Sequence, residues 1–217
     1  DDQAIFKWAG ADVDHFIALK EEVNDIKVLD QSYRIPGGPI HELSQKIINK
    51  VQNRFEKTYK PRDEIGLLKR YSDITQVDMS KGNWLVLSSA NYFLDDAKDL
   101  CEIQGWYYQY KGMNSVSLKL LLALNNWESW RKGEWLNHLE IKNIYQYLGS
   151  NVAVGYQKGK TLHSDAKYTL KECQEQHGLT ASDVWYRSFE GLDPMTETYI
   201  RNMRANGEMI NKNPRII

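Results

Sequence analysis

Residues 84–110 read WLVLSSANYFLDDAKDLCEIQGWYYQY, and three local patterns follow one another in this run. The apolar stretch 84–88 is typical of a buried strand, and the apolar residues of 93–103 recur with the period of a helix. Gly105 ends that helix, and the aromatic run 106–110 has the pattern of a second strand. A strand, a helix and a strand in about 27 residues predict a βαβ unit, and therefore a parallel sheet with a right-handed crossover.

The chain before this unit carries a similar alternation of helix and strand patterns. We predict a helix over 12–23 with Asp12 as its N-cap, and a short strand over 26–29. The break Pro-Gly-Gly-Pro at 36–39 precedes a helix over about 40–55, whose apolar residues keep a helical period. The predicted fold class is therefore α/β.

The helix predicted over 40–55 has a basic face that continues beyond its end. Its cations are Lys46, Lys50, Arg54, Lys57, Lys60 and Arg62. Such a face is either an ordinary solvated surface or a local footprint for DNA or another partner. A local footprint would be needed, because the net charge of −1 gives the whole chain no general attraction to nucleic acid.

After Gly112 the chain becomes strongly helical. The helical patterns cover 117–130, 136–148, 168–177, 181–189 and 199–208. Ser182 is the candidate cap of the helix over 181–189. The stretch 155–160 (Gly-Tyr-Gln-Lys-Gly-Lys) has neither the spacing nor the strand-to-helix setting of a phosphate-binding loop, and we interpret it as a basic turn.

The composition is that of an ordinary globular protein, with 41% hydrophobic and 26% charged residues. Cys101 and Cys173 lie far apart without metal-ligand spacing, which indicates reduced thiols in a cytosolic protein. No run approaches the ~18–20 apolar residues of a membrane span and no signal peptide is visible, so we expect no membrane association. The seven Trp and thirteen Tyr residues fit stacking surfaces and a well-filled core equally well.

The first eleven residues, Asp-Asp-Gln-Ala-Ile-Phe-Lys-Trp-Ala-Gly-Ala, place two aromatic side chains at alternate positions. In an extended chain Phe6 and Trp8 point the same way and offer a platform on which nucleic-acid bases can stack. Aromatic pairs at this spacing are also common in protein cores. Gln3 carries both donors and an acceptor, as a group that senses a phosphate or an attacking water needs.

Two stretches resemble motifs of a known family. Residues 1–12 resemble the third helicase motif of the UvrD/Rep/PcrA family of superfamily 1 DNA helicases, and 28–34 (Val-Leu-Asp-Gln-Ser-Tyr-Arg) resemble its fourth motif. They are separated by about the family's distance. The resemblance implies a RecA-like (P-loop NTPase-type) parallel-sheet domain, present in part, with a mostly helical inserted subdomain.

The resemblance also implies a domain organisation. Residues 1–26 would end a first RecA-like domain, 27–113 would begin a second one, 114–205 would form the helical insertion and 206–217 would return to the second domain. Residues 213–216 resemble the strand before the family's fifth motif. We therefore expect this chain to be an internal piece of a longer helicase.

By the same resemblance, Gln3 and Arg34 are the expected catalytic residues. Arg34 would contact the γ-phosphate of ATP, for which a planar guanidinium is well suited, and Tyr33 would stack on the adenine. Gln3 would link the γ-phosphate to the DNA site, where Phe6 and Trp8 would stack on single-stranded bases. Judged from the residues alone, a Tyr-Arg pair at a strand end more often forms an ordinary salt bridge.

Asn91 matches a family position in a loop that touches the DNA strand. The sequence departs from the family at three positions. Phe6 replaces the usual tyrosine and loses its hydroxyl group, whereas Ala9 and Ser89 replace frequent arginines and lose contacts to phosphate or base. These departures put some of the expected DNA contacts in doubt.

The chain lacks the Walker A loop (Gly-x-x-x-x-Gly-Lys-Ser/Thr) and the Asp-Glu motif of such helicases. ATP and Mg²⁺ are therefore expected to bind mainly through parts outside this chain, and no metal ligand is assigned within it. We expect the chain alone to be inactive as an ATPase.

The expected function is that of part of an ATP-dependent DNA helicase in the cytoplasm of a bacterial or phage-infected cell. With the remainder of its chain it would translocate on single-stranded DNA and unwind duplex at single/double-strand junctions. One alternative is the helicase subunit of a helicase–nuclease recombination complex. Another is a non-catalytic module that binds DNA or a partner through the basic face, which salt-dependent oligonucleotide binding that survives Trp8→Ala would favour.

Overall fold

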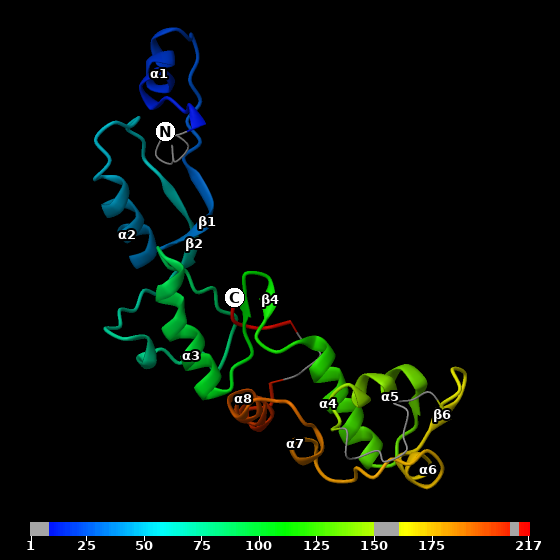
Figure 1. Ribbon diagram of the computed structural model, residues 1–217. Helices are drawn as coiled ribbons and strands as arrows, with labels where there is room; N and C mark the ends of the chain where they lie inside the picture. The colour runs from blue at the N-terminus through cyan, green and yellow to red at the C-terminus, as the bar shows by residue number, and fades with distance from the viewer. Residues whose placement is uncertain (1–8, 150–160, 209–212) are drawn as a thin grey trace. The chain divides into compact units, whose positions relative to one another are not determined.

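The computed structural model describes residues 9–149, 161–208 and 213–217, and the chain divides into two compact units, 1–71 and 72–217 (Figure 1). The described residues form a mixed α/β structure with several helices and a small parallel sheet of two strands. The predicted positions of Gln3, Phe6 and Trp8 lie outside the described residues. The domain boundaries expected at 26, 113 and 205 stay predictions.

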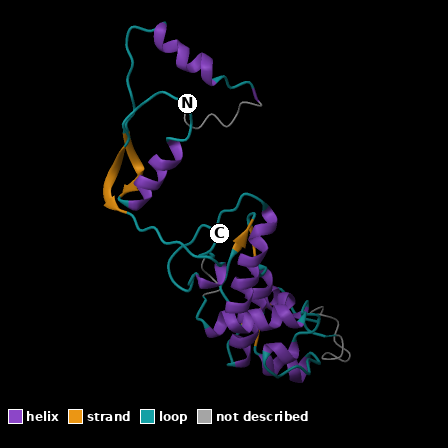
Figure 2. Cartoon of the chain, turned by 90° about the vertical axis from the view of Figure 1, so that its left-hand side faces the viewer, coloured by secondary structure: helices purple, strands orange, loops and turns teal. Residues whose placement is uncertain are grey.

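A helical crossover between two parallel strands organises the first unit. Its elements are α1 (Val13–Ala18), the 3-10 turn η2 (Leu19–Glu21), β1 (Gln31–Gly37), α2 (Pro39–Ile48) and β2 (Lys60–Ile65). The strands β1 and β2 pair in parallel, and α2 connects them and lies beside them (Figure 2). The first unit therefore contains a βαβ connection, although the pairing of its two strands is irregular.

Both ends of α2 follow from local chemistry. Gly38, at φ +71, precedes Pro39 at the first helical position, where the missing N–H of proline costs nothing. The prediction that this helix continues to residue 55 is wrong. At Lys50 and Val51 the backbone N–H groups donate to the third carbonyl before them instead of the fourth, and the tightened turn ends the helix.

The predictions for 12–29 are confirmed only at the helix start. The carboxylate of Asp12 accepts hydrogen bonds from the backbone N–H groups of Asp14 and His15, as an N-cap does. The helix ends at Ala18, well before residue 23, and the strand expected over 26–29 does not form. Strand pairing begins only at Gln31, because that is where the chain meets β2.

In the second unit, three segments that are far apart in the sequence pair in parallel through Ile216. Ile216 forms parallel bridges with Trp84 on one side and with Tyr108 on the other. Its carbonyl accepts from Gln109 at 2.8 Å, and the neighbouring Ile217 N–H donates to the Trp84 carbonyl at 3.0 Å. The prediction of two neighbouring parallel strands is wrong here. Residues 84–88 form no strand, the parallel pairing consists of single bridges, and residues 215–217 lie between the two segments.

The segment 84–88 is apolar on both sides but buried on one. Trp84 and Val86 pack against the core, whereas Leu85 and Leu87 are 67% and 80% exposed. The prediction of a fully buried strand is therefore wrong for half of its side chains.

The remaining elements include the hairpin of β3 and β4 and a group of helices. They are η3 (Ile74–Gln76), η4 (Asn91–Leu94), α3 (Asp95–Gln104), β3 (Gln109–Tyr110), β4 (Met113–Asn114), α4 (Leu118–Arg131), β5 (Leu136–Asn137), α5 (His138–Tyr145), β6 (Lys167–Tyr168), α6 (Leu170–Gln176), α7 (Trp185–Ser188) and α8 (Pro194–Ala205). Each helix predicted after residue 112 is present, but α7 is a single turn that Ser182 does not cap. The last helix, α8, begins five residues earlier than predicted, because Asp193 caps it and Pro194 occupies its first position.

Indole rings fill the core of the helical part. Trp127 and Trp130 of α4 are fully buried, and their ring centroids lie 6.0 Å apart in an edge-to-face arrangement. Each indole N–H has a partner, the carbonyl of Asp183 for Trp127 and that of Tyr168 for Trp130. Among the described residues, the tryptophan excess thus serves the core more than a stacking surface, with Trp135 as the exposed exception.

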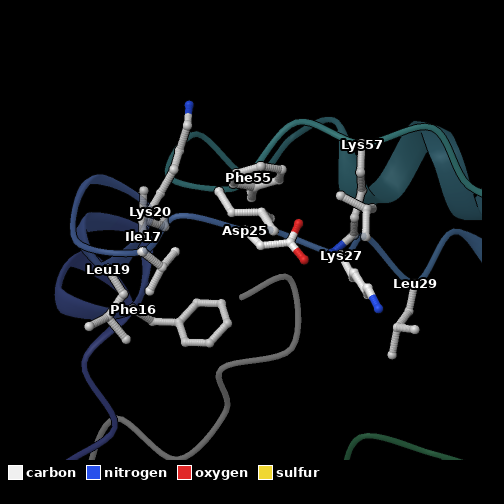
Figure 3. A pocket seen from close by; sticks show the side chains of 12 residues that line it. Phe16, Ile17, Leu19, Lys20, Asp25, Lys27, Leu29, Phe55 and Lys57 are labelled. Atoms are coloured by element: carbon white, nitrogen blue, oxygen red, sulfur yellow. The ribbon is translucent and has the colours of Figure 1, made fainter.

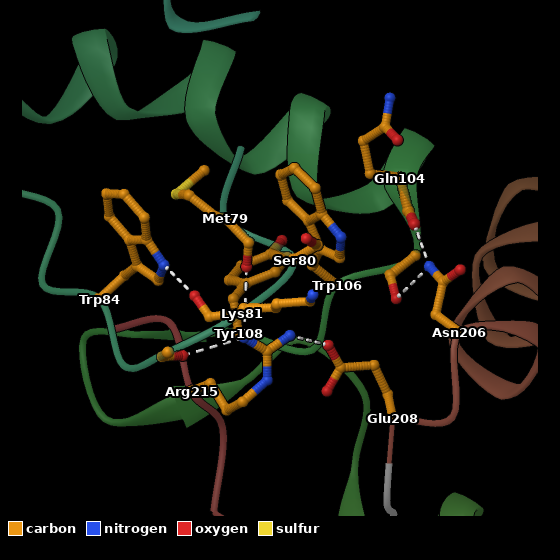
Figure 4. Close-up of polar contacts among 12 residues, drawn as sticks. Met79, Ser80, Lys81, Trp84, Gln104, Trp106, Tyr108, Asn206, Glu208 and Arg215 are labelled. Atoms are coloured by element: carbon orange, nitrogen blue, oxygen red, sulfur yellow. Dashed lines mark hydrogen bonds and ion pairs between the residues drawn. The ribbon is translucent and has the colours of Figure 1, made fainter. Parts of the chain in front are cut away.

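Two asparagines of α8 cap the C-terminal end of α3. Asn202 donates to the carbonyl of Ile103 at 3.2 Å, and Asn206 donates to the carbonyls of Gln104 and Gly105 (Figure 4). The last carbonyls of a helix lack partners within it, so these amides satisfy groups that would otherwise need water. The arrangement holds α8 directly against the end of α3.

Gly105→Ala should strongly destabilise the second unit. Gly105 has φ +68, and an added Cβ would lie 2.5 Å from backbone and Cβ atoms of Asn202. We expect the free energy of unfolding to fall by more than about 2 kcal/mol, because left-handed backbone strain and overpacking act together. Gly133→Ala is the control: it has φ +95 but nothing within 4 Å, and should cost about 1 kcal/mol. Tryptophan fluorescence during urea unfolding measures the stability of both variants. Equal losses of stability would contradict the close approach of Asn202 to Gly105.

The two cysteines should not react in the folded protein. Burial raises the pKa of the Cys101 thiol to about 12 and that of Cys173 to about 11, so both stay protonated where an unfolded thiol ionises. Their contribution to stability is complete below pH about 8.5 and is lost as the pH rises toward the folded values. We expect no reaction with Ellman's reagent at pH 8 and two thiols per chain in guanidinium. Fast reaction of the folded chain would contradict this burial.

In the part of the chain that the structure describes, no helix combines the length and the apolar character that crossing a membrane requires.

Candidate functional site

Strand β1 carries a large irregularity opposite the middle of β2. Gln31 pairs with Lys60 and Pro36 pairs with Arg62, so four residues of β1 face a single residue of β2. The Ser32 side chain is 3% exposed, and its hydroxyl oxygen accepts hydrogen bonds from the N–H groups of Arg34 at 3.2 Å and Ile35 at 2.8 Å. A buried serine therefore turns the backbone here, and such bulges reorient the side chains that they carry.

The bulge presents Tyr33 and Arg34 to solvent. The Tyr33 ring is 86% exposed and Arg34 is exposed beside it. Among the described residues, the Arg34 guanidinium has no hydrogen-bond or ion-pair partner. The salt bridge that a Tyr-Arg pair at a strand end would ordinarily form is therefore not seen in that part of the chain. Arg34 can offer a rigid fork of donors to a phosphate, and Tyr33 can offer a ring face.

The neighbouring cations, by contrast, are engaged by carboxylates. Lys60 lies 2.9 Å from Asp30, and this hydrogen-bonded ion pair lowers the pKa of Asp30 and raises that of Lys60. Arg62 pairs with Glu64 at 2.5 Å. Both pairs are exposed and so add little to stability, but they lower the positive charge available to a ligand on β2.

The basic face predicted over 46–62 is therefore not one continuous surface. Lys46 and Lys50 are exposed near the end of α2, whereas Arg54 is half-buried in the following loop. The helix stops at Ile48, so the regular spacing that would align these cations is lost. The interpretation as a helical DNA footprint loses its geometric basis.

Asn91 belongs to the second unit. It is the exposed first residue of η4, directly before the aromatic residues Tyr92 and Phe93. These two rings are more than half exposed, and their centroids lie 4.1 Å apart. The aromatic pair was not assigned from the sequence, although two consecutive aromatic residues after Asn91 are a visible signal.

A polar network around Arg215 joins the returning chain to the start of the second unit. The Arg215 guanidinium donates to the carbonyls of Met79 at 3.2 Å and Gly82 at 3.0 Å, and it pairs with the carboxylate of Glu208 (Figure 4). The Trp84 indole N–H donates to the Lys81 carbonyl in the same region at 2.8 Å. The sequence does not indicate the contacts of Arg215 with Met79 and Gly82, because these partners are more than 120 residues apart.

Comparison with family models, with curated proteins and with solved structures found no match. The site on β1 therefore has to be judged on its own geometry.

The described residues hold no group of three His, Cys, Asp or Glu side chains close enough to bind one metal ion. The candidate site thus consists of Tyr33 and Arg34 on the bulge of the first unit. Asn91 is a separate exposed position in the second unit. The structure does not describe Gln3, Phe6 and Trp8, which stay predictions.

Ser32→Ala should loosen the bulge. Removing the hydroxyl leaves the N–H groups of Arg34 and Ile35 without their acceptor. We expect the free energy of local opening to fall by about 1–2 kcal/mol, which corresponds to roughly 5- to 30-fold faster amide exchange at these two positions. The matched control is Ser44→Ala, since the Ser44 hydroxyl only donates to the His41 carbonyl. Hydrogen exchange measured residue by residue compares the two variants. Unchanged exchange at both amides in Ser32→Ala would show that the serine does not hold the bulge.

Proposed function

We propose that this chain is part of an ATP-dependent DNA helicase of the UvrD/Rep/PcrA type. The observation that carries the proposal is the exposed Tyr33–Arg34 pair on a bulge turned by a buried serine. The pair lies in the stretch that resembles the fourth motif, and the stretch that resembles the third motif lies about the family's distance before it. Two resemblances at the expected spacing and an available guanidinium support one nucleotide site.

In this proposal Arg34 contacts the γ-phosphate and Tyr33 stacks on the adenine. A guanidinium stabilises charge that develops on a phosphoryl group during transfer, and it acts best when no carboxylate competes for it. Lys60 and Arg62 on β2 have such carboxylate partners, which makes Arg34 the better candidate. ATP, when bound, supplies the phosphoanhydride whose hydrolysis drives movement. The Walker A and Asp-Glu motifs that hold ATP and Mg²⁺ would come from the remainder of the helicase chain.

The course of the chain supports the proposed inserted subdomain. The backbone leaves the parallel arrangement after Tyr108, forms the helices from α4 to α8, and returns at Ile216 between Trp84 and Tyr108. An insertion into a parallel sheet has this topology, because the strand that follows it must pair with strands that precede it. This is a reason to propose a RecA-like second domain with a helical insertion over 114–205.

Phe6, Trp8 and Asn91 are the proposed contacts to single-stranded DNA, and Gln3 is the proposed catalytic residue that links the γ-phosphate to the DNA site. Stacking of bases on Phe6 and Trp8 would provide the steps of translocation, with closure of the ATP cleft as the driving motion. The motor would act at single/double-strand junctions in the cytoplasm of a bacterial or phage-infected cell. The alternative, a non-catalytic module that binds DNA through the basic face, is weaker. The helix that would align these cations ends at Ile48, and Lys60 and Arg62 pair with carboxylates.

Arg34→Ala in the complete motor should lower DNA-stimulated ATP turnover by a factor of about 10³, since arginines of this kind contribute that much to phosphoryl transfer. The effect should fall on kcat rather than KM. Arg62→Ala is the matched control, because Arg62 is an exposed arginine on the neighbouring strand that already pairs with Glu64. The 217-residue chain by itself should show no turnover. ATP hydrolysis by that chain, or an active Arg34→Ala motor, would contradict the proposal.

A further inference from the structure

A hollow of about 460 Å³ lies within the first unit, apart from the Tyr33–Arg34 bulge (Figure 3). It is formed by α1, η2, the extended residues 25–29 and residues Phe55 and Lys57 of the loop after α2. Its volume lies in the range of pockets that enclose a small ligand or a few side chains.

The floor of the hollow is apolar and open to solvent. Phe16 is 58% exposed, and Val28 and Leu29 are exposed as well, although side chains of this kind usually pack against a partner. Ile17, Leu19 and Ile26 add further aliphatic surface. An open apolar concavity of this size is a typical binding surface.

The rim of the hollow is mainly basic. Among the described lining residues, the charged groups are Lys20, Lys27 and Lys57 and one carboxylate, that of Asp25. In Figure 3 the Asp25 carboxylate lies between the two phenylalanine rings, and the Lys27 ammonium lies at one end of the hollow. The excess of positive charge around an apolar floor calls for a ligand that combines apolar groups with negative charge.

The lining favours a peptide over a nucleic acid. A base buried among aliphatic side chains would leave its polar edges without hydrogen-bond partners, which is costly. The Phe55 ring already carries the Lys20 ammonium at 5.5 Å, so it is not a free stacking face. Lysines supply point charges that suit separate carboxylates, and Asp25 can accept a hydrogen bond from a peptide N–H.

We infer that this hollow is the docking site for an acidic peptide segment of a partner protein, with an apolar side chain on the floor and carboxylates on the lysine rim. The site is distinct from the proposed nucleotide contacts, because no lining residue lies on β1. Docking of this kind would recruit a partner without using Arg34.

The test uses the 217-residue chain and a fluorescein-labelled synthetic peptide that alternates aspartate with leucine and phenylalanine. Anisotropy should give a dissociation constant on the order of 10 μM. Lys27→Glu should weaken binding about tenfold, and Val28→Asp should abolish it, because it places a carboxylate on the apolar floor. Lys46→Glu is the matched control: it makes the same charge change at an exposed lysine of α2 outside the hollow, and should leave the affinity within about twofold.

Three outcomes would overturn the inference. They are equal weakening by Lys27→Glu and Lys46→Glu, equal binding of a peptide with asparagine in place of aspartate, and displacement of the peptide by an equal concentration of a thymidine oligonucleotide. Amide exchange at Arg34 and Ile35 shows whether each variant keeps the first unit folded. Arg34→Ala should bind the peptide normally, so failure of this inference and failure of the helicase proposal are separate results.

Discussion

The pairing of Ile216 with two segments at once is the constraint on which the second unit depends. Its partners Trp84 and Tyr108 precede it by more than one hundred residues, so these backbone hydrogen bonds close long loops of the chain. The Arg215 guanidinium strengthens the same junction by donating to two carbonyls near residue 80 and by pairing with Glu208. A short three-residue segment thereby pairs with two segments that precede the helices from α4 to α8.

The helical part of the second unit also contacts α3, through α8. The amides of Asn202 and Asn206 satisfy carbonyls at the end of α3, and Gly105 permits the close approach because it has no Cβ. In this helical part, the buried indoles of Trp127 and Trp130 contact each other, and each indole N–H donates a hydrogen bond to a backbone carbonyl. The helical part is thus connected by side-chain hydrogen bonds to the end of α3.

In the first unit, the strongest functional feature arises from a departure from regular structure. A continuous ladder between β1 and β2 would have alternated the side chains of 32–35 between two faces. The bulge instead gives up backbone pairing over these residues, and the Ser32 hydroxyl replaces two of the lost acceptors. The result is an exposed tyrosine and an arginine that no described carboxylate engages. The separate hollow is a second surface of this unit, with an apolar floor and lysines among its lining residues.

Local patterns predict the N-cap at Asp12, the helix end at Gly105 and the approximate positions of the helices after residue 112, because these depend on side chains within a few residues of one another. The cap predicted at Ser182 is wrong, because α7 begins at Trp185, and Tyr33 and Arg34 are candidates through a motif resemblance. Which strands pair and how β1 bulges depend on contacts between segments that lie far apart in the sequence. Several local patterns of this chain are nearly equal in energy, and hydrogen bonds between distant segments decide which of them form strands or bridges. Residues 26–29 therefore form no strand, whereas residues 215–217 lie between the segments of Trp84 and Tyr108 and pair with both.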